Sequence, residues 1–265
     1  MPLAPEIRKI PEIIGKFNRA GLTKELIGAL IKGETGRDLV EDARRLAAEF
    51  GGDQLVNVNG IENIPKNSGC LVVFNHPNID VLLPAILSLI VKVHDEDGPT
   101  PTILMGAEIP LLGKFNATRP LPGSISFINR FHRLYPKNII SVPISTTHRD
   151  YHSNRFMAAQ KAVAALRQGN MVLVAPEGHV EMNNTISPVN TFHSGSGSLS
   201  VIASRVGAPT VPVGIWETKR DGLIHVNTGE PFIVSTGNKN GAVSELMFRI
   251  AQTMPKELRG PFEQS

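Results

Sequence analysis

The residues best placed to do chemistry in this sequence are a histidine and an aspartate four positions apart. His76 closely follows the apolar run 70–74, and Asp80 comes four positions later. A histidine can act as a general base near neutral pH, and a neighbouring carboxylate can orient its ring and stabilise the imidazolium. We expect a helix with Pro77 at its first position and Asn75 or His76 as its cap, so that the spacing of four brings Asp80 back beside His76.

Taken alone, His76 and Asp80 are explained more simply as a helix cap followed by a surface carboxylate. The surrounding sequence pattern, however, favours a functional position for this pair. Residues 70–74 are continuously apolar and follow turn residues, which predicts a central strand covered on both faces. His76 would then lie where a strand ends and a helix begins, which is where open α/β sheets place their sites and where helix N–H groups favour negative charge.

A second apolar run ends in the same way. Residues 171–175 predict a buried strand, and Pro176, Glu177 and Gly178 follow it directly. The sequence therefore predicts two buried strands that each lead into polar groups.

Several familiar sites are absent from the sequence. No Gly-x-Ser-x-Gly elbow is present, and the segment 195–199 lacks the lysine of a P-loop and the third glycine of a dinucleotide loop, so we expect it to open a helix. His148 and His152 could share a helix face, but no glutamate follows His148, so they are interpreted as surface histidines. The single Cys70 excludes an internal disulfide and argues against a cysteine zinc site.

The composition indicates a folded chain with a substantial core. Of its 265 residues, 41% are hydrophobic, only 5% are aromatic, and the net charge is +3, which gives no reason to expect nucleic-acid binding. A slightly basic chain is compatible with anionic lipid surfaces or phosphorylated substrates. No signal-peptide pattern is visible, and the longest apolar run, 81–93, is too short to span a bilayer, so we expect any membrane contact to be peripheral.

The periodicity divides the chain into two parts. Residues 1–52 predict an N-terminal amphipathic helical segment, and residues 53–265 alternate strands with helices. We therefore predict an α/β fold, with a central, mostly parallel mixed sheet flanked by helices. The predicted strands are 55–58, 70–74, 102–105, 139–144, 171–175, 210–215, 223–226 and 232–234. The predicted helices after the N-terminal segment are 79–93, 126–134, 154–168, 195–206 and 243–254.

The N-terminal segment leaves two alternatives open. Its helices could pack their apolar stripes on the core, which is the commoner arrangement, or lie on an anionic bilayer. The second alternative is suggested by the basic residues between the apolar positions, which are Arg8, Lys9, Lys16, Arg19, Lys24 and Lys32.

The order of short motifs along residues 55–235 resembles the glycerophospholipid acyltransferase family, which includes 1-acyl-glycerol-3-phosphate acyltransferase. The motifs are Asn75-His76 with Asp80, an arginine segment, Pro176-Glu177-Gly178, Phe192-x-x-Gly195, and Val211-Pro212-Val213. Their joint order is more specific than any single motif. Two departures stand out: the family places four residues between the histidine and the aspartate whereas this chain has three, and His179-Val180 replaces the usual Thr-Arg after Gly178.

This resemblance assigns roles to residues within an acyltransferase domain spanning 53–265. It implies that His76 and Asp80 are catalytic and that Glu177, Gly178 and an arginine bind the acceptor. Arg149 follows a predicted strand at about the family's interval before Pro176, so we favour it over Arg130, which resembles the family's arginine block by letter but lies in a predicted helix.

The resemblance also implies a reaction in phospholipid biosynthesis. An acyl group would pass from acyl-CoA or acyl-carrier protein to the hydroxyl of a glycerol-phosphate or lysophospholipid acceptor, in particular 1-acyl-glycerol-3-phosphate. No metal or bound cofactor is expected, and the enzyme would work in the cytoplasm at a peripheral membrane face. Two alternatives remain at this point: a tafazzin-like phospholipid–lysophospholipid transacylase, suggested by the segment 176–182, and a non-catalytic peripheral lipid-binding protein.

Overall fold

One seven-stranded sheet organises the chain. The computed structural model describes residues 21–107, 110–111, 119–120, 124–143, 151–177, 180–181, 185–187, 194–220 and 222–263. The strand order is β1-β9-β8-β2-β7-β3-β6, and every neighbouring pair is parallel except β8 with β9. This confirms the predicted mostly parallel mixed sheet. The bounds are β1 (Val56–Asn59), β2 (Cys70–Phe74), β3 (Pro101–Gly106), β6 (Ile139–Val142), β7 (Met171–Val174), β8 (Thr210–Glu217) and β9 (Ile224–Thr228).

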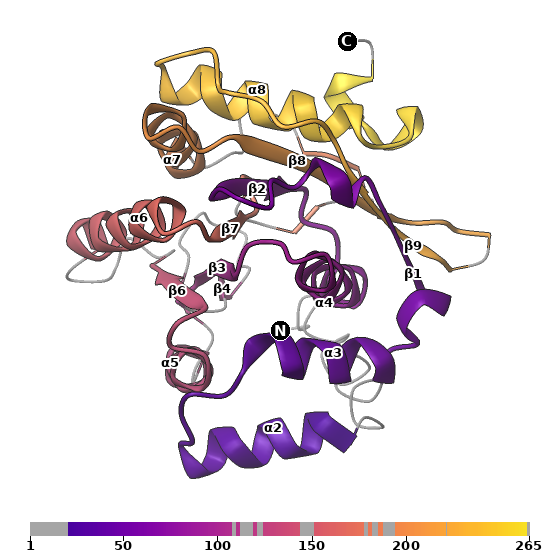
Figure 1. The fold of residues 1–265 in the computed structure, drawn as a ribbon, viewed down its shortest axis with the longest axis vertical. Helices are drawn as coiled ribbons and strands as arrows, with labels where there is room; N and C mark the ends of the chain where they lie inside the picture. Colours follow the sequence, from indigo (N-terminus) through magenta and orange to yellow (C-terminus); the bar gives the residue numbers. More distant parts are fainter. Residues whose placement is uncertain are drawn as a thin grey trace.

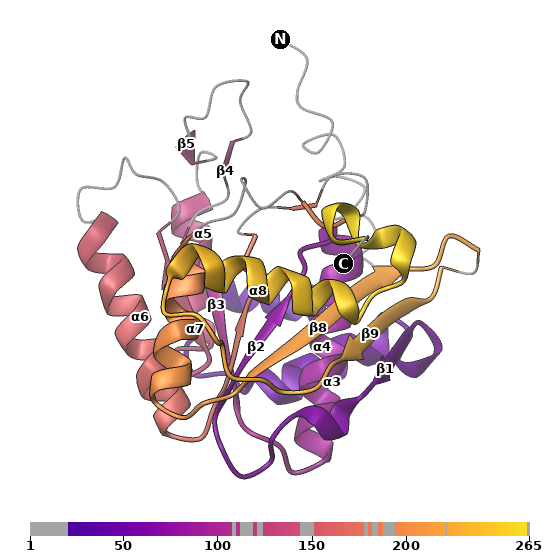
Figure 2. The same cartoon turned by 90° about the horizontal axis from the view of Figure 1, so that it is seen from above.

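Helices cover both faces of this sheet. One face carries α6, α7 and α8, with α7 packed between the other two (Figures 1 and 2). The other face carries α4, and Figure 1 shows α3 and then α2 as further layers beyond it. The bounds are α2 (Gly21–Lys32), α3 (Leu39–Glu49), α4 (Ile79–Asp95), α5 (Ser124–Leu134), α6 (Tyr151–Arg167), α7 (Ser194–Arg205) and α8 (Lys239–Gln252).

The remaining elements are short. The strands β4 (Pro110–Leu111) and β5 (Arg119–Pro120) pair antiparallel outside the main sheet. Single 3₁₀ turns lie at η1 (Gly52–Gln54), η2 (Ile61–Asn63), η4 (Lys256–Leu258) and η5 (Gly260–Phe262).

The central strand β2 is buried along its whole length. Each of its five residues is at most 6% exposed, because β7 and β8 flank it and helices cover it from both sides. Its side chains alternate between two cores: Leu71 and Val73 join the cluster under α6, α7 and α8, whereas Val72 and Phe74 join the cluster under α4. A continuous apolar run is what such a strand requires. The same burial fixes the position of the residues that follow the strand.

The described N-terminal helices pack their apolar side chains on the protein core. Leu22, Leu26 and Leu30 of α2 are buried in one cluster with Ile90 of α4 and Tyr135. The helix also keeps apolar groups at its surface, since Ile27 and Ile31 are 45% and 70% exposed. The expected basic residues Arg8, Lys9, Lys16 and Arg19 lie outside the described residues, whereas Lys24 and Lys32 are exposed on α2.

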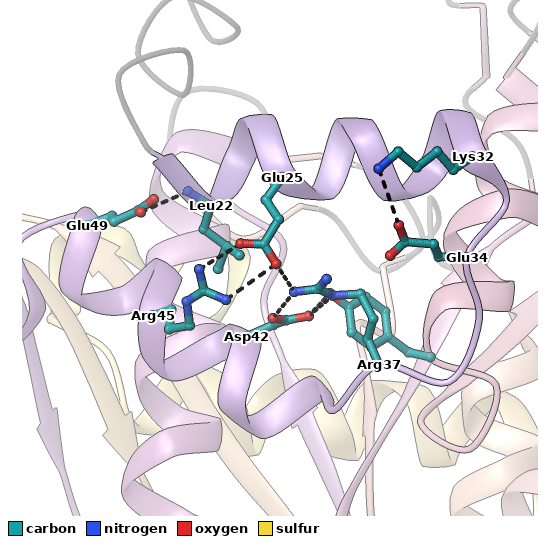
Figure 3. A network of polar contacts seen from close by, with 9 residues as sticks. Leu22, Glu25, Lys32, Glu34, Arg37, Asp42, Arg45 and Glu49 are labelled. Atoms are coloured by element: carbon teal, nitrogen blue, oxygen red, sulfur yellow. Dashed lines mark hydrogen bonds and ion pairs between the residues drawn. The ribbon is translucent and has the colours of Figure 1, made fainter.

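A polar network joins α2 to α3 (Figure 3). Glu25 of α2 accepts from Arg37 and Arg45, and Arg37 also forms a two-pronged ion pair with Asp42, at 2.7 Å for both contacts. Tyr135 donates to the buried Asp42 at 2.7 Å. Burial and the bond to Asp42 raise the pKa of Tyr135 well above its usual range. This network holds the helical pair against the α/β body.

Two local predictions are wrong. The helix after β2 begins at Ile79 with Asn78 as its N-cap, so Pro77 lies before the helix rather than at its first position. Residues 232–234 form no strand, because only a single bridge from Phe232 to Thr210 is present. Within the part of the chain that the structure describes, no helix has the length and apolar character needed to span a bilayer.

Candidate active site

The site lies at the carboxyl edge of the parallel strands. His76 follows β2, Glu177 follows β7, and the ends of β3 and β6 lie beside β7 at the same edge. In open α/β sheets this edge is where ligands bind. The structure therefore brings the two predicted strand ends, at His76 and Glu177, into contact.

Asn75 anchors the end of β2 within the sheet. Its amide Nδ2 donates to the Ile215 carbonyl at 2.8 Å, and its Oδ1 accepts from the Ile215 N–H at 2.7 Å. Nδ2 also donates to Oε1 of Glu181 at 2.9 Å. The side chain is fully buried, so these bonds have no competition from water. The helix-cap role predicted for Asn75 is wrong, since its side chain is used to tie β2 to β8.

Glu177 holds the backbone of His76. Its Oε2 accepts from the His76 N–H at 2.9 Å, and its Oε1 accepts from the Ser187 N–H at 3.0 Å. The side chain is fully buried. Both described bonds therefore join backbone segments to one carboxylate, which fixes where His76 leaves the strand. Contact between Glu177 and a substrate stays a prediction.

Glu181 is a second buried carboxyl beside His76, and the motifs did not single it out. Its backbone N–H donates to the His76 carbonyl at 2.8 Å, while its Oε1 accepts from Asn75. Burial, and then the charge of Glu177, raise the pKa of Glu181 to about 8, although the bond from Asn75 lowers it in part. Its Oε2 is buried and has no hydrogen-bond partner among the residues that the structure describes.

The ring of His76 is half-buried and contacts the next residue. Its Nδ1 lies 3.3 Å from the Pro77 carbonyl oxygen. A carbonyl oxygen only accepts, so this contact requires Nδ1 to carry a proton, and in the neutral ring the lone pair that a general base uses then lies on Nε2. The backbone thus favours the tautomer that base catalysis needs.

Asp80 lies in the first turn of α4 with its side chain exposed. His76 precedes the N-cap of this helix, so no helical spacing of four pairs the two residues, and that prediction is wrong. Among the described residues, no hydrogen bond or ion pair joins the Asp80 carboxylate to His76. The catalytic pairing of His76 with Asp80 stays a prediction.

A cavity of about 390 Å³ opens at His76. It lies between the sheet edge and the amino-terminal halves of α6 and α7, and its size is typical of small-molecule sites. Polar groups come from His76, Arg155, Ser196 and Ser198. The described walls are otherwise apolar, and consist of Leu104, Met105, Gly106, Val142, Pro143, Phe156, Ala158, Ala159, Val174, Ala175, Pro176, Gly195 and Leu199.

Arg155 of α6 packs against the start of α7. One of its guanidinium nitrogens lies 2.4 Å from the position that a Cβ at residue 195 would take, so Gly195 leaves room for this side chain. Ser196 donates to the Pro176 carbonyl at 3.3 Å, which ties the start of α7 to the turn after β7. The segment 195–199 does open a helix, as predicted.

The arginines predicted to bind the acceptor are not brought to the cavity by any described contact. Arg130 lies exposed on α5, and its Nη1 donates to the Leu30 carbonyl at 3.3 Å, which links α5 to α2. Arg149 and Gly178 lie outside the described residues. Their roles stay predictions.

Sequence reasoning missed three residues of this site, namely Arg155, Ser196 and Glu181. Arg155 and Ser196 belong to no local sequence motif that marks a site. They line the same cavity only because α6 and α7 pack side by side. Glu181 left one signal, a charged residue shortly after Pro176-Glu177-Gly178. No cluster of three or more His, Cys, Asp or Glu side chains suited to a metal ion occurs in the described ranges.

The sheet and its cavity define an α/β protein with a ligand site at the carboxyl edge of its strands. The protein family described as Acyltransferase matches residues 55–216, which is more than half of the chain. The chain belongs to this acyltransferase family and is an acyltransferase. Membership confirms the resemblance seen in the motifs and favours an enzyme over the non-catalytic alternative.

A solved structure shares the fold. The crystal structure of the 1-acyl-sn-glycerophosphate (LPA) acyltransferase PlsC from Thermotoga maritima is similar to this chain, with a TM-score of 0.50 and 18% sequence identity. The match covers 98% of this chain and 96% of that chain. No curated protein sequence matches this chain.

Proposed function

We propose that this enzyme transfers a fatty acyl group from a thioester donor, acyl-CoA or acyl-carrier protein, to the hydroxyl of a glycerol-phosphate acceptor, in particular 1-acyl-glycerol-3-phosphate. The observation that carries the proposal is the position of His76, at the end of a buried central strand and at the mouth of a mostly apolar cavity. A general base beside an apolar cavity suits a substrate with a reactive polar end and a long apolar chain.

In this mechanism His76 acts as the general base. The acceptor hydroxyl oxygen attacks the thioester carbonyl carbon while its proton moves to Nε2 of His76. The tetrahedral intermediate then collapses, the carbon–sulfur bond breaks, and the leaving thiolate takes the proton back from the imidazolium. Asp80, at the start of α4, is proposed to stabilise that imidazolium. No covalent acyl-enzyme is required.

The cavity is proposed to hold the acyl chain. Its apolar walls favour burial of methylene groups, each worth about 0.8 kcal/mol when removed from water. Arg155 supplies a described cation at the same cavity, and Arg149 is proposed as a further phosphate ligand, since arginine matches phosphate oxygens with two parallel bonds. Arg130, Glu177 and Gly178 remain proposed contacts of the acceptor. The reaction is proposed to need no metal or cofactor.

We also propose that the enzyme works at the surface of a membrane, on the cytoplasmic side. Phe156 lines the cavity yet is 62% exposed, and the adjacent Met157 is 50% exposed. Apolar side chains beside a lipid-binding cavity suit contact with a bilayer that supplies the acceptor.

A purified-protein assay tests the proposed reaction. Acyl-CoA and acyl-carrier protein would each be paired with glycerol 3-phosphate and with 1-acyl-glycerol-3-phosphate, and the acylated product measured. We expect turnover with a thioester donor and 1-acyl-glycerol-3-phosphate. A parallel reaction contains labelled phospholipid and lysophospholipid but no thioester. It distinguishes a tafazzin-like transacylase from an enzyme that needs a thioester donor. Transfer in that reaction alone would contradict the proposed donor.

A further inference from the structure

Glu181 contacts both residues that end the central strand at the site. Its backbone N–H donates to the carbonyl of His76, and its side-chain Oε1 accepts from Asn75. Asn75 is in turn bonded twice to Ile215 of β8. Together with Glu177, Glu181 therefore links the segment after β7 to the peptide that carries the His76 ring.

The surroundings of the Glu181 carboxyl disfavour a negative charge. The residue is 6% exposed, and its Oε2 is buried without a hydrogen-bond partner among the described residues. The described titratable groups beside it are Glu177, from the turn after β7, and His76, from the end of β2; β8 contributes the uncharged Ile215 through Asn75.

Glu177 takes two backbone N–H bonds, which stabilise its ionised form. Among the residues that the structure describes, a second buried carboxylate beside it would find neither a full set of hydrogen-bond partners nor a lysine or arginine to neutralise its charge. An unpaired buried hydroxyl costs much less free energy than an unpaired buried charge. The same causes raise the pKa of Glu181 to about 8. The neutral acid is therefore the stable form of Glu181 at neutral pH.

We propose that Glu181 is a positioning residue for His76 and that it fills this role as an uncharged carboxylic acid. When Glu181 loses its proton, repulsion from Glu177 and the unpaired oxygen drive the segment at Glu181 away from the end of β2. The bond from the Glu181 N–H to the His76 carbonyl is then lost, so that Glu177 holds the His76 peptide only at its N–H and the ring turns out of its catalytic position. This inference rests on the proposed role of His76 as the general base.

If the proposal is right, the rate of acyl transfer falls at alkaline pH because a single group, the Glu181 carboxyl, loses its proton. In the wild-type enzyme, kcat should fall about tenfold for each pH unit above the apparent pKa of Glu181. Glu181→Gln keeps a neutral side chain of the same shape and an oxygen for Asn75. It should retain most of the wild-type kcat at pH 7 and exceed the wild type by about tenfold or more at about pH 9.5.

The pH profile needs a matched control and a blank. Glu230→Gln removes an exposed carboxyl that follows β9, a strand that β8 separates from β2, and should leave the alkaline limit where the wild type has it. A reaction without enzyme corrects for alkaline hydrolysis of the thioester. An alkaline limit shared by the wild type and Glu181→Gln would overturn the proposal.

Infrared spectroscopy tests the protonation state without any activity. The difference spectrum between the wild type and Glu181→Gln at pH 7 should contain the carbonyl stretch of a protonated carboxylic acid, and this band should disappear as the pH rises through about 8. If Glu181→Gln does not fold, the wild type is tested alone: the band should be present at pH 7 and should disappear as the pH rises through about 8. Absence of the band at pH 7 would refute an uncharged Glu181.

The two proposals can fail separately. If His76→Ala is as active as the wild type, the proposed function of His76 fails, whatever Glu181 does. If His76→Ala is inactive, but Glu181→Gln leaves the alkaline limit unchanged, only the inference about Glu181 fails.

Discussion

The backbone N–H of His76 donates to Oε2 of Glu177, with 2.9 Å between the two atoms. These residues lie 101 positions apart in the chain, and they meet because β2 and β7 are adjacent parallel strands that end at the same edge of the sheet. The carboxylate therefore fixes the backbone of the proposed base, and the base can be displaced by changes that never touch its ring.

Glu177→Gln tests this positioning. The glutamine oxygen can still accept one backbone N–H, but its amide nitrogen cannot accept the second, so a buried donor is left unpaired at His76 or Ser187. We expect the free energy of unfolding to fall by about 1–3 kcal/mol, with a loss of kcat that exceeds any change in KM. Denaturant unfolding and steady-state kinetics measure the two effects. The surface variant Glu230→Gln should change neither, and a Glu177→Gln enzyme with wild-type kcat would show that this bond does not matter for catalysis.

The free energy of unfolding should depend on pH through Glu181. The folded protein holds this proton up to about pH 8, whereas the ordinary pKa of a glutamate is 4.5. Between these values the folded state binds more protons than the unfolded state, so the contribution of Glu181 makes the protein less stable as the pH rises. Urea titrations of the wild type and Glu181→Gln across this range isolate the effect, since other groups cancel in the difference. The wild type should lose stability relative to the variant between about pH 5 and 8 and remain level above that. A difference that does not change with pH would contradict the raised pKa.

Narrowing the cavity should select against long acyl chains. Ala159 lines the cavity on α6, whereas Ala164 is exposed on the same helix. Ala159→Leu adds three carbon atoms to the wall, so kcat/KM for long-chain donors should fall by about tenfold relative to short-chain donors. Ala164→Leu adds the same atoms at the surface and should leave this ratio unchanged. If Ala159→Leu instead raises only the KM of the glycerol-phosphate acceptor, the cavity holds the acceptor and not the acyl chain.

Much of the fold was predictable because its strongest signals are local. The continuous apolar runs at 70–74 and 171–175, bounded by turn residues, favour strands covered on both faces, and these strands indicate the carboxyl edge of the sheet as the place of the site. The predicted start of α7 near Gly195 agrees with the structure for the same reason, because the small residues that open a helix act within one turn.

The wrong predictions concern residues whose local preference gives way to a distant partner. Asn75 is a good helix cap by type, yet Ile215, 140 positions away, offers it a donor and an acceptor in the sheet. The helix then starts later, at Ile79, and the expected one-turn spacing of His76 and Asp80 is lost. Arg155 could not be found, and Glu181 was indicated only by its charge, for a related reason: their contacts with Gly195 and with Asn75 join residues far apart in the sequence.

The direct test of the general-base assignment is the kcat of His76→Ala in acyl transfer from a thioester to 1-acyl-glycerol-3-phosphate. The control is His94→Ala, which removes an exposed histidine in the last turn of α4, at the opposite end of that helix from the site. Both variants should unfold cooperatively like the wild type. A general base contributes about 10²- to 10⁴-fold to the rate, so His76→Ala should lose at least about 100-fold in kcat while His94→Ala keeps wild-type turnover. A folded His76→Ala enzyme that turns over like the His94→Ala control would contradict the account.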